Sequence, residues 1–113
     1  MATAQIRAIL FEPLLDDILT FAHGVQIAPM SLYKILEEVK SIRRFQLVQR
    51  SVDRLKLRMI AEDRALAFEE AIRELRAFLE SKGLTGVEVR LSDTPPQANQ
   101  TSGKCKHIYR DFD

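Results

Sequence analysis

Several residue types that would define a class of protein are scarce in this chain. Its 113 residues include one cysteine, no tryptophan, four glycines and four prolines. One cysteine cannot form an internal disulfide or a cysteine metal cluster, so we expect a reducing cytoplasm as the location. The 17 basic and 16 acidic side chains nearly cancel. Nucleic acid is therefore not the expected partner, because binding a phosphate backbone needs a strong cationic field.

Long apolar runs and metal-binding groupings are also missing from the sequence. No apolar run approaches the roughly 20 residues needed to cross a bilayer, and the first 30 residues show no signal-peptide layout. We therefore expect no membrane partner. His23 and His107 lie far apart with no carboxylate cluster beside them, so no metal site is predicted. No glycine-rich phosphate loop and no Ser/His/Asp arrangement is present, so the chain holds no complete catalytic machinery.

The sequence does contain a hydrophobic fraction of 46%, enough for the modest core of one small domain. Residues 64–82 repeat apolar side chains at helical spacing, and Gly83 is a typical helix stop. A second helix is expected to begin at Ser31 as its N-cap. Residues 45–49 and 54–60 predict a hairpin, because the second segment alternates apolar and charged side chains.

Shorter extended segments complete the pattern at residues 18–21, 25–27 and 87–91, with a short strand or turn near the C-terminus. The expected order is strand, helix, strand, strand, helix, strand. This order predicts a small ferredoxin-like α+β sandwich, in which an antiparallel sheet carries two helices on one face. Residues 1–13 are expected to form an N-terminal arm outside this sandwich.

Three basic side chains, Arg54, Lys56 and Arg58, occupy the polar positions of the second hairpin segment. A basic sheet face can bind RNA, but recognition on a sheet needs exposed aromatic rings that stack on bases. The exposed positions of this segment carry charge and no ring. The favoured interpretation is a solvated sheet face.

Lys104 is the most informative residue of the chain. It follows Ser102 and Gly103 at the far end of a polar stretch, Ser92 to Ser102, that has no core-forming pattern. A lysine after a glycine-marked loop is placed to reach beyond its own domain, and its ammonium group suits a phosphate or carboxylate oxygen. A solvated surface lysine is the alternative, because Ser-Gly-Lys alone is a weak motif. Cys105 lies beside this lysine, where nearby cations favour the thiolate, but a nucleophilic role is not the favoured interpretation.

Three segments together resemble the C-terminal domain of adenylate-forming acyl-CoA ligases, most closely the phenylacetate-CoA ligase branch. The first is an acidic pair, Asp16-Asp17, followed by a glycine turn and Pro29 before a helix. The second is the strand Phe45-Gln46-Leu47-Val48-Gln49, and the third is Thr101-Ser102-Gly103-Lys104. The resemblance covers residues 14–113, in order and at fitting spacing.

The resemblance implies a role for Lys104 in adenylation. The lysine would reach the α-phosphate and the acyl carboxylate oxygens, where it would stabilise charge that develops during transfer. Ser102 and Gly103 would belong to the loop that supports this lysine.

The resemblance also implies a domain rotation between two half-reactions. Asp16 would be the hinge residue whose backbone torsions change on rotation. After rotation, His23 and Gly24 would line the path of the coenzyme A thiol arm. Residues 1–13 would then be the remnant of the connection to another domain, and residues 14–113 the mobile lid domain.

The expected partner is a large N-terminal adenylating domain, in the same chain or on a separate one. The domain alone would bind no cofactor, whereas ATP with magnesium, and coenzyme A, would belong to the complete enzyme. Two departures from the family pattern are visible: Pro13-Leu14 replaces a Gly-Arg pair, and Cys105 replaces an aromatic residue. A second interpretation therefore stays open, a non-catalytic ferredoxin-like binding or regulatory module derived from that domain, with a homodimer formed through the apolar arm.

Overall fold

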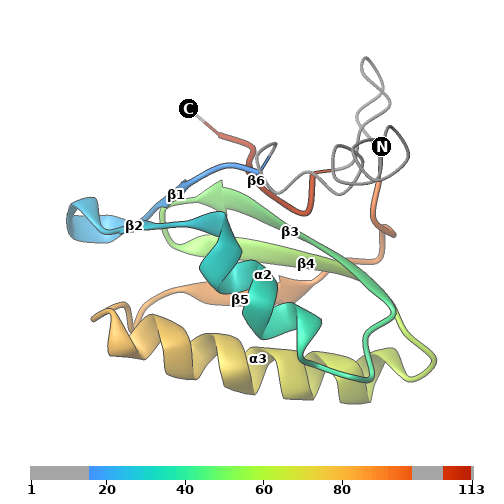
Figure 1. The fold of residues 1–113 in the computed structure, drawn as a ribbon. Coiled ribbons are helices and arrows are strands. Elements are labelled where there is room, and N and C mark those ends of the chain that lie inside the picture. The colour runs from blue at the N-terminus through green and yellow to red at the C-terminus, as the bar shows by residue number, and fades with distance from the viewer. Residues whose placement is uncertain (1–15, 98–105, 113) are drawn as a thin grey trace, which may run out of the picture.

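A four-stranded sheet forms the centre of the computed structural model, which describes residues 16–97 and 106–112. Its strands lie in the order β5-β4-β3-β6. They span Arg44–Ser51 (β3), Arg54–Ile60 (β4), Glu88–Leu91 (β5) and Ile108–Arg110 (β6). Strands distant in sequence are thus neighbours, because the C-terminal strand β6 pairs with β3 (Figure 1).

The remaining elements precede the sheet or cross between its strands. A two-stranded antiparallel sheet joins β1 (Leu19–Thr20) to β2 (Gln26–Ile27). The two helices are α2 (Pro29–Glu37) and α3 (Arg64–Ser81). Both helices lie on the same side of the four-stranded sheet (Figure 1).

The sheet is antiparallel at its centre and parallel at its edges. β3 and β4 form the predicted antiparallel hairpin, whereas β4–β5 and β3–β6 are parallel pairs. α3 connects β4 to β5, and a helix between adjacent strands of one sheet returns the chain in the same direction. The predicted α+β class is confirmed, and the structure is consistent with a small ferredoxin-like sandwich with two helices.

The hydrophobic core lies between the helices and the sheet. α3 contributes the small residues Ala67 and Ala71, which allow it to approach the sheet closely, together with Leu75 and Leu79. Several other fully buried side chains come from the remaining elements: Leu19, Leu32, Leu36, Leu47, Leu57 and Ile108. One cluster therefore joins the small β1–β2 sheet, both helices and all four strands of the larger sheet.

The two helices begin in different ways. α3 is capped by the side chain of Asp63, which accepts a hydrogen bond of 3.1 Å from the backbone N–H of Leu66. The prediction that Ser31 is the N-cap of the other helix, α2, is wrong. α2 already begins at Pro29, whose fixed φ suits the first helical position, so Ser31 lies inside the first turn.

Candidate functional site

An acidic pair contacts the C-terminal strand at the edge of the sheet. The backbone N–H of His107 donates to the Asp16 carboxylate at 2.8 Å, and the backbone N–H of Arg110 donates to the Asp17 carboxylate at 2.9 Å. Asp17 also forms an ion pair of 3.1 Å with the Lys106 ammonium group. We call these five residues, Asp16, Asp17, Lys106, His107 and Arg110, the terminal clamp.

The terminal clamp fixes β6 from its outer side. The backbone N–H of Asp17 donates to the carbonyl oxygen of Ile108 at 2.9 Å, while the other side of the strand pairs with β3, where Leu47 lies beside Ile108. A three-residue edge strand has few ladder hydrogen bonds of its own. The clamp therefore supplies polar contacts that hold this strand, through residues about ninety positions earlier in the chain.

Gln46 holds both ends of the segment that carries Lys104. This β3 side chain is 1% exposed. Its amide nitrogen donates to the carbonyl oxygens of Gln97 at 2.9 Å and Lys106 at 2.7 Å, and its oxygen accepts from the Gln97 backbone N–H at 3.1 Å. Gln97 and Lys106 are the described residues that flank residues 98–105. One buried amide thus brings together the two stems of that segment.

Arg58 connects this amide to the rest of the sheet. Its guanidinium donates to the side-chain oxygen of Gln46 at 2.9 Å and to the Tyr109 hydroxyl at 3.2 Å. A buried side-chain amide is costly unless its donors and acceptors find partners. The network therefore stabilises one orientation of Gln46, with its nitrogen toward the two stems.

Burial dominates the electrostatics of Asp16. The half-buried position of Asp16 raises the pKa of its carboxyl above 3.8, and the hydrogen bond from His107 opposes this rise without cancelling it. Burial likewise raises the pKa of Tyr33, helped by the negative charges of Glu37 and Asp16. The charged forms of Asp16 and Tyr33 are therefore disfavoured.

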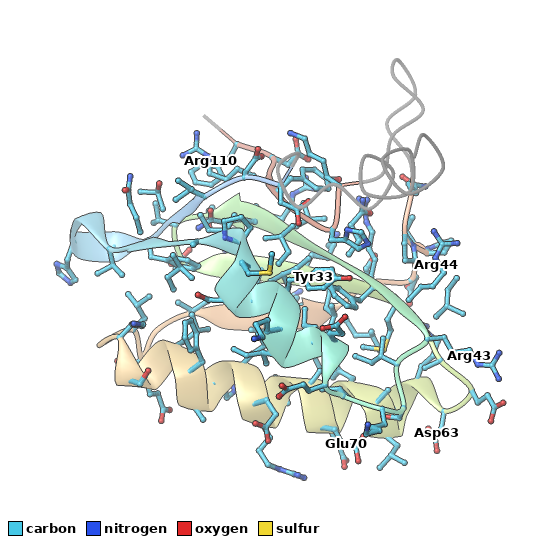
Figure 2. The ribbon with its side chains drawn as sticks, in the orientation of Figure 1. Tyr33, Arg43, Arg44, Asp63, Glu70 and Arg110 are labelled. Atoms are coloured by element: carbon cyan, nitrogen blue, oxygen red, sulfur yellow. The ribbon has the colours of Figure 1, made fainter. Side chains whose placement is uncertain are left out.

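Three rings pack beside the clamp. The Tyr33 ring meets the His107 ring edge-on at 5.1 Å between centroids, and Phe45 lies 5.3 Å from Tyr33 and 5.7 Å from His107. These rings line a depression of about 250 Å³ whose rim includes Arg43 and Arg44. Figure 2 shows Tyr33 on α2 on the side of the molecule where Arg43 and Arg44 project. The depression thus combines ring side chains with two arginines and one acid, Glu37.

His23 and Gly24 lie in a 3₁₀ turn (η2, Ala22–Gly24) at the tip of the β1–β2 hairpin. Both residues have positive φ, +61° for His23 and +74° for Gly24. A side chain at Gly24 would meet no atom within 4 Å, so the torsion rather than crowding favours glycine here. The hairpin tip projects from the body of the domain (Figure 1).

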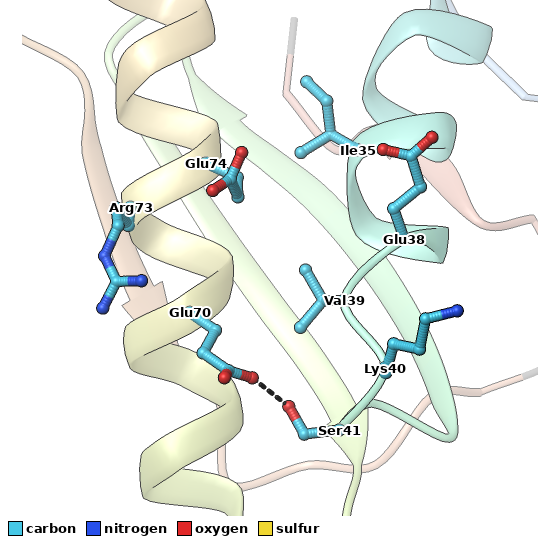
Figure 3. Close-up of a pocket in the computed structure, with 8 residues that line it drawn as sticks. All are labelled: Ile35, Glu38, Val39, Lys40, Ser41, Glu70, Arg73 and Glu74. Carbon is cyan, nitrogen blue, oxygen red and sulfur yellow. Dashed lines mark hydrogen bonds between the residues drawn. The ribbon is translucent and has the colours of Figure 1, made fainter.

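A groove of about 510 Å³ lies between the end of α2 and the outer face of α3 (Figure 3). Ile35 and Val39 supply its apolar wall, and the Ser41 hydroxyl donates to Glu70 across it. The remaining lining side chains carry charges of both signs: Glu38, Lys40, Arg73 and Glu74. The Ser41–Glu70 hydrogen bond joins the segment after α2 to α3 within this lining of mixed charge.

Lys104, Ser102, Gly103 and Cys105 lie outside the described residues, as does the arm of residues 1–13. The structure brings Asp16 together with the strand after the lysine segment, whereas His23 and Gly24 occupy the separate hairpin tip. Sequence reasoning missed the role of Gln46, although the strand containing it carried part of the family resemblance. A glutamine in the middle of a buried strand was the available signal.

Two kinds of site are absent from residues 16–97 and 106–112. No group of three or more metal-ligating side chains occurs in these ranges. None of the helices described there is long and apolar enough to span a membrane. No family model, curated protein or solved structure matches the chain.

Proposed function

We propose that this chain is the mobile C-terminal domain of a phenylacetate-CoA-ligase-like enzyme that forms acyl adenylates. In this proposal the domain supplies Lys104 to an active centre built by a large adenylating domain. That large domain would hold ATP with its magnesium ion and the acyl substrate, and coenzyme A would enter in the second half-reaction. The domain alone is inactive, and the single cysteine suits a cytoplasmic enzyme.

The observation that carries the proposal is the anchoring of both stems of the lysine segment. Gln46 binds Gln97 on one side and Lys106 on the other. The terminal clamp then holds the strand that follows, through Asp16 and Asp17. A lysine that stabilises developing charge must be presented from a fixed base, because small displacements weaken electrostatic stabilisation.

The clamp also limits which backbone torsions near Asp16 could serve as the proposed hinge. The Asp16 side chain bonds to His107, and the backbone N–H of the next residue, Asp17, bonds to Ile108. The ψ torsion of Asp16 lies between these two anchors. Rotation of the domain would therefore use the φ torsion of Asp16 and the residues before it, with the clamp kept intact.

Reconstitution tests this function. The chain is combined with the large adenylating domain of a phenylacetate-CoA-ligase-like enzyme, and pyrophosphate release is measured with candidate aryl and acyl acids. Lys104→Ala should lower the rate about 10²-fold or more, the scale of losing one electrostatic stabiliser. Lys40→Ala, which changes an exposed lysine in the turn after α2, is the control and should leave the rate unchanged. An unchanged rate in Lys104→Ala removes this lysine from the mechanism.

The second candidate is a binding or regulatory module that kept the fold and lost the chemistry. Pro13-Leu14, in place of the Gly-Arg pair, favours this candidate because a nucleotide-contacting arginine is missing. It predicts no pyrophosphate release with any large domain, although the chain folds and the clamp forms.

A further inference from the structure

The sheet face opposite the helices carries a cationic depression. The depression has a volume of about 290 Å³ at the end of the sheet near the β3–β4 turn. Four cations and one acid line it, together with one leucine: Arg50, Arg54, Lys56, Arg90, Glu88 and Leu55. α2 and α3 lie on the other face (Figure 1), so neither helix covers this one.

Two of these cations are direct neighbours across the sheet. The register of β4 and β5 places Lys56 beside Arg90, between the pairs Leu55–Val89 and Leu57–Leu91. Since the leucines point into the core, both cationic side chains point to the opposite face. Adjacent strands are only about 4.8 Å apart, and like charges directly opposite one another destabilise a sheet.

The nearby acid does not neutralise this pair. Glu88 contacts the Arg90 guanidinium at 3.0 Å and the Arg54 guanidinium at 3.9 Å, so one carboxylate is shared by two arginines. Within the described part of the chain, Lys56 forms no ion pair. Glu88 therefore compensates Arg90 in part and leaves the charge of Lys56 without an acidic partner in the described residues, a local conflict of the kind found at binding sites.

We propose that this depression binds the phosphate group of a small phosphorylated ligand. A phosphate between Lys56 and Arg90 would replace their repulsion with charge-assisted hydrogen bonds. The side chains of Arg54 and Arg90 are 70% and 73% exposed and are free to turn toward the anion. This site is separate from the terminal clamp and does not depend on the proposed ligase function.

A single small ligand fits better than a nucleic acid. Binding of single strands on a sheet relies on aromatic rings that stack on successive bases. In the described residues, the strand register places the Tyr109 ring beyond Val48 on the far edge strand, and Arg58 already donates to its hydroxyl. The volume of the depression matches one compact ligand rather than a polymer.

Thermal unfolding of the full chain tests the proposal, with inorganic phosphate as the probe against chloride at equal ionic strength. Phosphate should raise the Tm of the wild type in a saturable way. Lys56→Gln should raise the Tm in low salt without phosphate, because it removes the like-charge pair. The same variant should bind phosphate about fivefold more weakly, the scale of one exposed ion pair.

Arg76→Gln on the exposed face of α3 is the matched control. It should change neither the Tm without phosphate nor the affinity for phosphate. Lys56→Arg should keep the response to phosphate. An equal response to phosphate in the wild type and Lys56→Gln overturns the site. Tight binding of a single-stranded oligonucleotide that phosphate and a sugar phosphate do not displace overturns the assignment to a small ligand. These measurements use the chain without a large adenylating domain. Their outcomes therefore do not test the ligase proposal.

Discussion

The helix-covered half of the domain and the terminal clamp are held together by different kinds of contact. Between α3 and the sheet the contacts are apolar, and Leu75 is completely buried there. At the β6 edge the contacts are hydrogen bonds and an ion pair made by Asp16 and Asp17. Apolar packing supplies most of the stability of a small domain, whereas polar contacts select one arrangement among alternatives. The apolar packing of α3 on the sheet thus maintains the fold, and the terminal clamp positions strand β6.

The largest effect is expected in the apolar region. Leu75→Ala should lower the free energy of unfolding by about 2–5 kcal/mol, because it removes buried methyl groups and leaves a cavity. Urea denaturation measures this change. Leu66→Ala is the control on the same helix, since Leu66 is 47% exposed and should cost far less. Equal losses in the two variants would contradict the placement of the core.

Loss of the buried amide should give an intermediate effect that is local in character. Gln46→Leu removes the hydrogen bonds to Gln97 and Lys106 and should cost about 1–3 kcal/mol. Hydrogen exchange should accelerate at Gln97 and at residues 106–110. Gln49→Leu is the matched control, because that side chain instead binds the backbone of Thr20 at 2.8 Å. If both variants accelerate hydrogen exchange at the same amides, the hydrogen bonds of Gln46 do not specifically anchor Gln97 and Lys106.

The two acids of the clamp should respond differently to amide substitution. Asp17→Asn weakens the ion pair with Lys106 and should cost about 1 kcal/mol or less, since both side chains are partly exposed. Asp16→Asn keeps an oxygen that accepts from His107, and it removes a carboxylate that burial disfavours. Thermal unfolding at pH 7 should therefore rank Asp16→Asn above Asp17→Asn in stability.

The pH dependence of Asp16→Asn tests the raised pKa. In the folded state the carboxyl binds its proton more tightly than in the unfolded chain, so wild-type stability falls as pH rises from about 3.8 through the folded pKa. Asparagine removes this dependence. The stability of Asp16→Asn minus that of the wild type should be larger at pH 7 than at pH 4. A difference that grows toward acid would contradict the cause assigned to the shift.

The smallest effect is expected for an exposed pair outside both regions. Arg43 and Glu62 form an ion pair of 2.8 Å with side chains that are 66% and 83% exposed. Arg43→Ala should change the free energy of unfolding by less than about 1 kcal/mol. A larger loss in urea denaturation would show that Arg43 contributes more than a surface ion pair.

The sequence was sufficient to predict the apolar region. The repeat of apolar residues over 64–82 predicted α3, and the alternation of charged and apolar side chains predicted β4. Both patterns are local, because burial on one side of an element recurs at that element's own period. The hairpin between β3 and β4 followed from the same alternation.

The contacts of the terminal clamp were not predictable in this way. Asp16-Asp17, taken in isolation, resembles an ordinary solvated turn, yet the pair binds residues about ninety positions away. The three residues of β6 are too few to show a period, and the parallel pairing with β3 depends on the whole fold. The pairing of the like-charged Lys56 and Arg90 was also not predictable, because it depends on the register of β4 and β5.

Separate measurement of the two half-reactions tests whether the anchored segment presents Lys104 for adenylation. In the reconstituted enzyme, acyl-adenylate formation and thioester formation from preformed acyl adenylate are followed separately for Lys104→Ala and the wild type. Lys104→Ala should lose about 10²-fold or more of the rate of the first step and change little in the second. Unchanged adenylation, or equal losses in both steps, would contradict this role of Lys104.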